Sequence, residues 1–223
     1  MAKSNREVRV AVILSGCGVY DGSEVYESVL TLLRLDQLGA KIHCFAPNMD
    51  QMHVVNHLTG EEVSGESRNV LVEASRIVRG DIEDIANASM DDFDALIVPG
   101  GFGVAKNLSS FAVDGAAMSI DKNLVRLVNS ARQAKKPIGL ICIAPAMSGL
   151  LFGDGVQCTI GHDVETANVL AQTGAVHVNC NVDNVHIDHR HNLVTTPAYM
   201  LAQRISDAAV GINKLVDTVL EMT

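Results

Sequence analysis

The segment PIGLICIAPAMSGLL, residues 137–151, gives the strongest indication of the fold. Its apolar run from Pro137 to Ile141 has the length of a buried strand. Cys142 follows at once, and the small residues from Ala144 to Leu151 predict a helix. A strand, a lone nucleophile and a helix in this order resemble a nucleophile elbow, in which a sharp turn presents the reactive side chain above a parallel sheet.

The same alternation of strand and helix continues on both sides of this stretch. Apolar runs predict strands, and apolar residues at helical spacing predict helices. The expected strands are 8–14, 41–46, 95–98, 157–160, 175–178, 185–188 and 193–196, and the expected helices are 24–38, 68–78, 122–134, 164–173 and 197–220. This order predicts an α/β three-layer sandwich, a mostly parallel sheet with helices on both faces. No linker is visible, so residues 1–223 are expected to form a single domain.

Composition narrows the class of protein. The formal net charge of the chain is −9, and an acidic surface repels phosphate backbones, so a nucleic-acid partner is not expected. The longest apolar runs are far shorter than the roughly 20 residues of a membrane helix, so no membrane association is expected. The polar N-terminal residues 1–9 indicate no targeting segment. Five cysteines without a CxxC pair favour reduced thiols, and hence a cytoplasmic location.

The cysteine at the predicted elbow is the leading candidate nucleophile. A thiol at a helix N-terminus lies near the positive end of the helix dipole, which favours the reactive thiolate. The alternative is a buried structural cysteine, which is common because cysteine behaves as a small apolar residue. The residues alone leave both interpretations of Cys142 open.

Two glutamates and one histidine are the candidates for proton transfer. Glu24 and Glu27 are spaced to share one face of the first helix, at the sheet edge where the elbow is expected. The alternatives are a capping box from Asp21 to Glu24 and a solvated Glu27. His162 has a side chain suited to proton shuttling near neutral pH, or it simply begins a helix.

Other motifs predict no cofactor and no metal. His186, His189 and His191 form a cluster, but Arg190 lies within it and no second ligand cluster accompanies it, so a solvated hairpin turn is favoured over zinc. The glycine-rich segments Gly16–Gly18 and Gly100–Gly103 fit neither a dinucleotide fingerprint nor a P-loop.

Several segments together resemble the ElbB-like ("enhancing lycopene biosynthesis protein") family of the DJ/PfpI superfamily. The resemblance covers about residues 8–220, and the segments that carry it are LSGCGVYDGSE (14–24), NHLTGE (56–61), VPGGFG (98–103), KNL (106–108), CIAPA (142–146) and TTPAYM (195–200). It implies a flavodoxin-like, class I glutamine amidotransferase-like fold. It also implies that the protein forms a homodimer.

The resemblance further implies a site and an activity. Cys142 would be the nucleophile, Glu27 or Glu24 its carboxyl partner, and the backbone N–H groups of Gly101 and Ile143 an oxyanion site. Many members of the superfamily place a histidine at about the spacing of His162. The implied activity is a cofactor-independent glyoxalase that converts methylglyoxal or glyoxal, small α-oxoaldehydes, to lactate or glycolate.

Two further hypotheses use the same fold. The thiol of Cys142 could instead serve a non-enzymatic, redox-responsive stress protein through oxidation to a sulfinic acid. Glutamine amidotransferase activity is disfavoured, because it requires a His-x-Glu pair just before the last helix. Thr195 to Tyr199 occupy that position in this chain.

Overall fold

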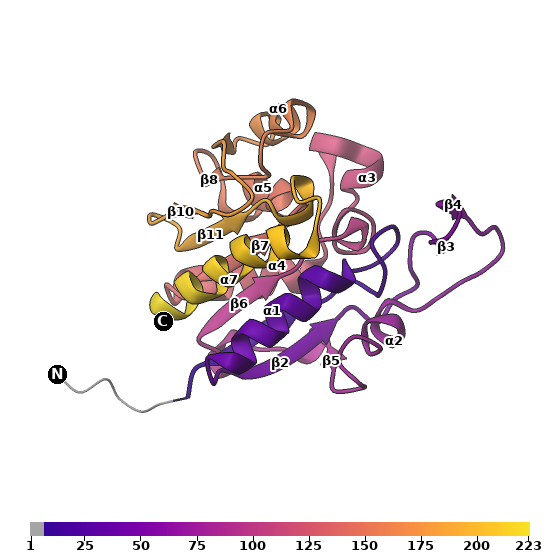
Figure 1. Cartoon of the computed structure of the whole chain (residues 1–223), viewed down its shortest axis with the longest axis horizontal. Helices are drawn as coiled ribbons and strands as arrows, with labels where there is room; N and C mark the ends of the chain where they lie inside the picture. The colour runs from indigo at the N-terminus through magenta and orange to yellow at the C-terminus, as the bar shows by residue number, and fades with distance from the viewer. Residues whose placement is uncertain (1–6) are drawn as a thin grey trace.

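The computed structural model describes residues 7–223 and is built around one seven-stranded sheet (Figure 1). The strand order is β10-β11-β7-β6-β1-β2-β5, and every pairing in this sheet is parallel except that of β10 with β11. The strands are β1 (Arg9–Ile13), β2 (Lys41–Ala46), β5 (Glu83–Asp84), β6 (Ala95–Val98), β7 (Ile138–Ile141), β10 (His186–Asp188) and β11 (Leu193–Thr196).

Helices cover both faces of this sheet, which confirms the predicted three-layer α/β sandwich with a flavodoxin-like, mostly parallel sheet. Figure 1 shows α1 and α7 lying side by side across one face. The helices are α1 (Val25–Gln37), α2 (Val70–Ala74), α3 (Phe111–Asp114), α4 (Lys122–Gln133), α5 (Ser148–Phe152), α6 (Val164–Gln172) and α7 (Ile205–Glu221). The sheet therefore separates two apolar cores.

Side-chain alternation along β1 explains these two cores. Ala11 and Ile13 point into the core that contains Leu124 of α4, whereas Val10 packs into the core that contains Ile212 of α7. Because helices cover both faces, the central strands are buried on both sides and read as continuous apolar runs. The local sequence therefore predicted β6 and β7 within a residue of their observed bounds.

Several predicted boundaries are wrong. α2 is five residues long instead of extending over 68–78. The last helix does not begin at Pro197 but at Ile205. A 3₁₀ turn over Ala198–Met200 comes first, and its first residue, Ala198, has a left-handed φ of +44° that a right-handed helix starting at Pro197 would not contain. The predicted helix 144–151 is a 3₁₀ turn, Ala144–Met147, followed by α5. Local periodicity cannot detect such turns, because tertiary contacts impose them.

Two small pairs of strands lie outside the main sheet. The hairpin β3 (Val55–Asn56) and β4 (Glu61–Glu62) was not predicted, and it projects at the right of Figure 1. The strands β8 (Gln157–Cys158) and β9 (Val176–His177) pair with each other in parallel. The single-domain prediction and the absence of a targeting segment both extend to residues 1–6, which lie outside the described residues.

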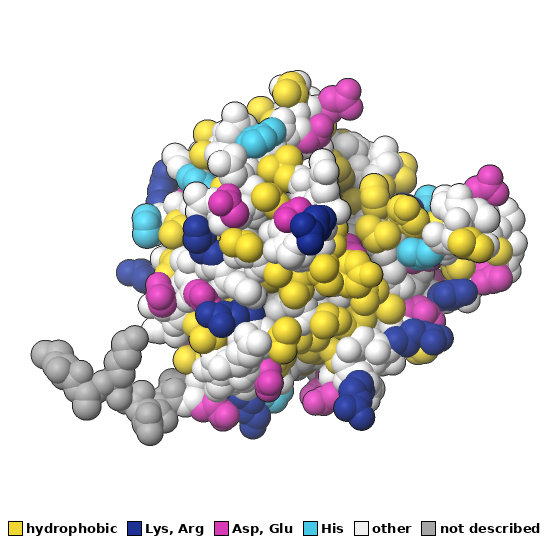
Figure 2. Space-filling model, viewed as in Figure 1, with side chains coloured by type: hydrophobic (Ala, Val, Ile, Leu, Met, Phe, Trp, Pro, Cys, Tyr) yellow, Lys and Arg dark blue, Asp and Glu magenta, His cyan; other side chains and the backbone are white. Residues whose placement is uncertain are grey.

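Within residues 7–223, no helix combines the length and the apolar character needed to cross a bilayer. The surface does carry one apolar region, which Figure 2 shows as yellow side chains over α1. Its exposed residues on α1 are Val25, Tyr26, Val29 and Leu33. Apolar residues at this helical spacing, left uncovered, are typical of an interaction surface.

Candidate active site

The elbow cysteine lies directly after β7. Cys142 has φ of +63°, a left-handed conformation that is costly for a residue with a Cβ. Its N–H donates to the carbonyl of Thr196 at 2.9 Å, which ties the turn to the end of β11. The residue is buried, with 7% of its surface exposed, yet it lines a cavity. A strained turn with a cavity-facing thiol is the geometry of a nucleophile elbow.

The carboxyl group of Glu27 lies behind this thiol. Glu27 is fully buried in the first turn of α1. Its Oε1 accepts a hydrogen bond from the N–H of Tyr199 at 3.1 Å, and its Oε2 accepts one from the N–H of Gly100 at 3.0 Å. The same carboxyl is hydrogen-bonded to the side chain of Cys142. Two backbone donors therefore hold the group in one orientation toward the sulfur.

Glu24 has a different place on the same helix. It is the N-cap of α1, and its Oε2 accepts a hydrogen bond from the N–H of Glu27 at 2.6 Å. Glu24 lines the cavity beside Cys142, whereas Glu27 is not among the lining residues. The capping box expected from Asp21 is wrong, because the buried Asp21 carboxyl instead accepts from the N–H of Val55 at 2.7 Å.

Burial dominates the electrostatics of the pair. Desolvation raises the pKa of Glu27 to about 7, and the nearby charge of Glu24 adds to this, while hydrogen bonds from Tyr199, Cys142 and Gly100 oppose it. Desolvation also raises the pKa of the Cys142 thiol well above its ordinary value. The negative charge of Glu27 and the hydrogen bond to it raise the Cys142 pKa further, whereas the N–H groups of Gly101 and Ile143 lower it.

The sequence-based expectation of a low thiol pKa is therefore wrong for the resting pair. The helix after Cys142 begins as a single 3₁₀ turn, and burial outweighs its dipole. Because the two groups are coupled, they titrate as a pair. Protonation of Glu27 removes the charge that opposes the thiolate, and the carboxylic acid then donates a hydrogen bond to the sulfur.

Two glycines make this close packing possible. A Cβ on Gly100 would lie 2.6 Å from Oε2 of Glu27 and 3.0 Å from Sγ of Cys142. Gly101 has φ of +100°, and a Cβ there would run into the backbone of Ser23 and Glu24. The Pro-Gly-Gly loop after β6 thus supplies one N–H to the carboxyl and one toward the sulfur. The sequence prediction included Gly101 but missed Gly100 and Tyr199, although both belong to the segments that carry the resemblance.

The cavity in front of Cys142 has a volume of about 570 Å³. Its walls are mostly apolar and come from loops that follow several strands, as expected at the carboxyl edge of a parallel sheet. The lining residues are Val19, Tyr20, Glu24, Val55, Gly60, Gly101, Phe102, Ala105, Lys106, Phe111, Ala112, Cys142, Ile143, Thr166, Tyr199 and Met200.

His162 does not lie in this cavity. It is exposed and lines a separate hollow with Asp183 and Leu201. Gly161, with φ of +98°, turns the chain there and packs against Leu201. The proposal that His162 shuttles protons for Cys142 is therefore not supported, because its spacing along the chain does not translate into proximity in space.

The histidine cluster forms the predicted hairpin. His186 lies in β10, which pairs antiparallel with β11, and the turn between them contains His189 and His191. Nδ1 of His191 lies 2.7 Å from Oδ2 of Asp188, so the His191 side chain stabilises the turn. Over the described range 7–223, no three His, Cys, Asp or Glu side chains group together as metal ligands would.

The chain resembles known proteins over almost its whole length. No family model matches it. It is 46% identical to the human mitochondrial glutamine amidotransferase-like class 1 domain-containing protein 3, over 96% of this chain and 83% of the human protein. It is 45% identical to the mitochondrial ES1 protein homolog of Rattus norvegicus, over 96% of this chain and 84% of the rat protein.

Solved structures agree with these relatives. An isoprenoid biosynthesis protein with an amidotransferase-like domain from Ehrlichia chaffeensis superposes with a TM-score of 0.89 at 38% identity, over 96% of this chain and 99% of that one. Drosophila melanogaster DJ-1beta, at 19% identity and a TM-score of 0.55, shares the fold alone. The fold and the elbow cysteine thus define a protein with a class 1 glutamine amidotransferase-like domain. Within that class, the chain belongs to the family of the ES1 proteins and glutamine amidotransferase-like class 1 domain-containing protein 3.

These relatives also correct one prediction. The cysteine content was interpreted as typical of a cytoplasmic protein. The human, rat and zebrafish relatives, each matching 96% of this chain, are named mitochondrial. Reduced thiols indicate a reducing environment and do not distinguish one such compartment from another, so the cytoplasmic prediction is wrong.

Proposed function

We propose that this protein, as an ElbB-like member of its superfamily, is a glutathione-independent glyoxalase that converts methylglyoxal to lactate and glyoxal to glycolate. One observation supports the proposal above all: a buried carboxyl, Glu27, is hydrogen-bonded to the thiol of Cys142 at the base of a cavity. The protein needs no cofactor for this reaction, because the chemistry is nucleophilic addition followed by proton transfer.

The first step is addition of the thiolate to the aldehyde. The sulfur of Cys142 forms a bond to the aldehyde carbon, and the electron pair of the carbonyl moves to its oxygen. The N–H groups of Gly101 and Ile143, which act on the Cys142 sulfur, lie where they can stabilise that developing charge. The raised pKa of Glu27 lets it hold a proton near neutral pH, and a protonated Glu27 no longer opposes the thiolate with its charge.

The second step moves a proton between adjacent carbons. A carboxylate removes the proton from the former aldehyde carbon, and the neighbouring carbonyl carbon is protonated, which yields a thioester of a 2-hydroxy acid. Glu27 is the partner of the sulfur, and Glu24 faces the cavity. Hydrolysis by water then breaks the carbon–sulfur bond, releases lactate or glycolate and restores the thiol.

The proposal is tested by measuring lactate formation from methylglyoxal by NMR. The wild-type protein and Cys17→Ser, which changes a half-buried thiol outside the cavity lining, should both form lactate. Cys142→Ser should lose at least about 10³-fold in rate, because a hydroxyl is a weaker nucleophile than a thiol and gives up its proton far less readily. Lactate formation at the uncatalysed rate by the wild-type protein would refute the proposal.

A redox-responsive role is the second candidate, and the pairing of Cys142 with Glu27 favours it. A protonated Glu27 can donate a hydrogen bond to a sulfinate oxygen, and the N–H groups of Gly101 and Ile143 can donate to the same group. Mild peroxide should then oxidise Cys142 before Cys17, as peptide mass analysis would show. Earlier oxidation of Cys17 would count against this role.

We also propose that the protein forms a homodimer of single-domain subunits. The exposed apolar residues of α1 support this, because a water-soluble monomer gains from covering such a face. Light scattering on the purified protein measures the mass directly. Tyr26→Glu and Val29→Glu, on the exposed face of α1, should shift a dimer toward monomer, whereas a wild-type monomer at micromolar concentration would refute the proposal.

A further inference from the structure

The cavity is much larger than the small aldehydes that the reaction implies. Its volume of about 570 Å³ falls within the range of about 300–1,000 Å³ that is typical of sites for drug-sized ligands. Methylglyoxal has only five heavy atoms and fills a small part of such a space. Most of the lining would then contact water instead of substrate.

The lining is also chemically one-sided. The charged side chains in the lining are Glu24 and Lys106. Apart from the thiol of Cys142, most of the other side chains are aromatic or aliphatic. Lys106 already has partners, because its Nζ donates to the carbonyl of Tyr20 at 2.8 Å and lies 5.6 Å from the ring centroid of Phe102. The Lys106 ammonium group is therefore engaged by Tyr20 and Phe102 at the rim of the cavity. The walls above Cys142 remain apolar.

Two aromatic side chains at this rim are held open toward solvent. Tyr20 is 41% exposed and Phe102 is 49% exposed. The N–H of Phe102 donates to the carbonyl of Val19 at 2.8 Å, and the N–H of Tyr20 donates to Nε2 of His57 at 3.2 Å. Fixed backbone bonds thus hold apolar rings in water beside a reactive thiol, an arrangement that a bound apolar group would stabilise.

We infer that the preferred substrate is an α-oxoaldehyde whose ketone carbon carries an aromatic or branched apolar group. The inference rests on the proposed function and names its substrate class. The aldehyde carbon lies at Cys142, and the apolar group extends over Phe102 and Phe111 toward the mouth. Methylglyoxal is then a minimal substrate that uses the reacting groups and leaves the apolar walls empty.

The first test compares phenylglyoxal with methylglyoxal by kcat/KM. The wild-type protein should prefer phenylglyoxal by at least about tenfold, since each apolar group added in a fitted pocket is worth about 10–200-fold. Phe102→Ala should lower this preference about tenfold. The matched control is Val113→Ala on α3, because Val113 is 69% exposed and does not line the cavity. It should keep the preference.

The second test does not depend on turnover. Thiolates displace chloride from 2-chloroacetophenone and from chloroacetone, so that a sulfur–carbon bond forms while the carbon–chlorine bond breaks and chloride leaves. Each rate at Cys142, measured by peptide mass mapping, is divided by the rate with free β-mercaptoethanol. The corrected preference for the phenyl reagent should be at least about tenfold at Cys142 and near one at Cys17, and it should fall in Phe102→Ala.

The two tests separate the two proposals. Turnover of methylglyoxal without a phenyl preference in either test would overturn the inference and leave the glyoxalase proposal standing. A phenyl preference in alkylation without turnover of either aldehyde would refute the glyoxalase proposal and support the apolar pocket. A preference that Val113→Ala loses as strongly as Phe102→Ala would also overturn the inference, because it would reflect the fold and not the rim.

Discussion

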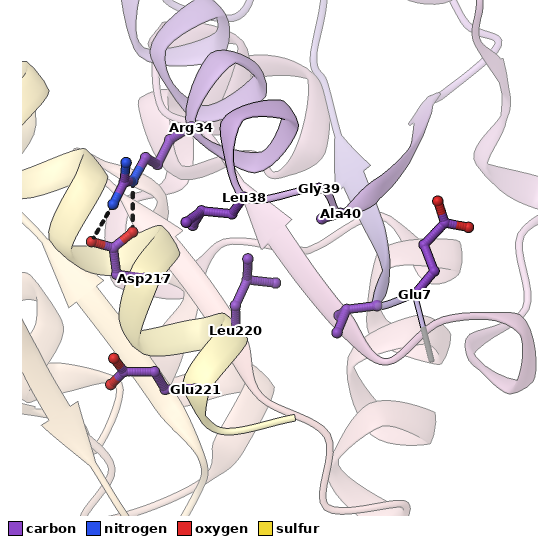
Figure 3. A pocket seen from close by; sticks show the side chains of 9 residues that line it. Glu7, Arg34, Leu38, Gly39, Ala40, Asp217, Leu220 and Glu221 are labelled. Atoms are coloured by element: carbon purple, nitrogen blue, oxygen red, sulfur yellow. Dashed lines mark hydrogen bonds and ion pairs between the residues drawn. The ribbon is translucent and has the colours of Figure 1, made fainter. Parts of the chain in front are cut away.

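The two ends of helix α1 hold carboxylate contacts of opposite kinds. At the N-terminal end, Glu27 is fully buried, and backbone N–H groups and a thiol surround its carboxyl. At the C-terminal end, Arg34 and Asp217 of α7 form a bidentate ion pair with distances of 2.7 and 2.8 Å (Figure 3). That pair borders a groove of about 440 Å³, and both of its side chains are partly exposed.

The difference lies in how each charge is compensated. A full opposite charge compensates Asp217, and both side chains are partly exposed, so the pair joins α1 to α7 as a surface contact. Backbone N–H groups and a thiol face the Glu27 carboxyl, and burial raises its pKa to about 7, within the range where it can exchange protons in solution. The same helix therefore carries a scaffold contact at one end and, at the other, a carboxyl that can exchange protons near neutral pH.

Replacing the carboxyl at each end of α1 should have unequal effects on activity. Glu27→Gln should lower α-oxoaldehyde turnover by about 10²–10⁴-fold, because an amide cannot carry the proton. It should also destabilise the fold, since the amide NH₂ would face the N–H of either Gly100 or Tyr199. Asp217→Asn is the matched control and should leave kcat within about twofold. Equal turnover in the two variants would remove Glu27 from the reaction.

The stability of the folded protein should depend on pH through the buried carboxyl of Glu27. The pKa of Glu27 rises from an ordinary 4.5 to about 7 in the folded protein, so the folded state binds the proton more tightly than the unfolded state. Its stabilising contribution is complete below about pH 4.5 and is lost as the pH rises through 7. The loss corresponds to about 3 kcal/mol.

Chemical denaturation at several pH values measures this contribution. The difference in unfolding free energy between wild type and Glu27→Gln should decrease between pH 5 and pH 7.5. A wild-type stability that rises relative to Glu27→Gln across this interval would contradict the raised pKa.

Glycines at the two ends of α1 offer a steric test. Gly101 packs against the N-terminal end, where an added Cβ would collide with the backbone of Ser23 and Glu24. Gly39 follows the C-terminal end with φ of +73° and nothing within 4 Å of an added Cβ. Gly39→Ala should cost about 1 kcal/mol for its conformation alone, and Gly101→Ala should cost clearly more. Thermal melts of both variants measure this difference. Similar melting temperatures would show that the loop around Gly101 relaxes to accommodate the added Cβ.

The smallest effect is expected for the ion pair itself. Arg34→Met and Asp217→Asn should each lower the unfolding free energy less than Gly39→Ala does, because the pair is partly exposed and screened by water. The double variant should lose little more than either single one. Denaturant titrations at low and high salt measure the loss. A loss larger than that of Gly101→Ala, and independent of salt, would mean that the pair behaves as a buried one.

Much of the site was visible in local sequence. The apolar run before Cys142 predicted a central strand and therefore the elbow, because a buried strand and the residue after it are set by adjacent residues. Glu24 and Glu27 were both correct as residues at the start of the first helix, but spacing could not separate them, since both lie on one face. His162 was misjudged for the same reason: a spacing along the chain says nothing of where a loop turns.

The layers, the central strands and the position of Cys142 at a strand end follow from the order of the residues, because burial on both sides of a parallel sheet leaves a continuous apolar pattern. Which carboxyl pairs with the thiol depends instead on contacts between distant parts of the chain. The donors that hold Glu27 come from Gly100 and Tyr199, which lie 73 and 172 residues away along the chain. The pKa values of the pair follow from that burial, and burial is a property of the assembled fold and not of neighbouring residues.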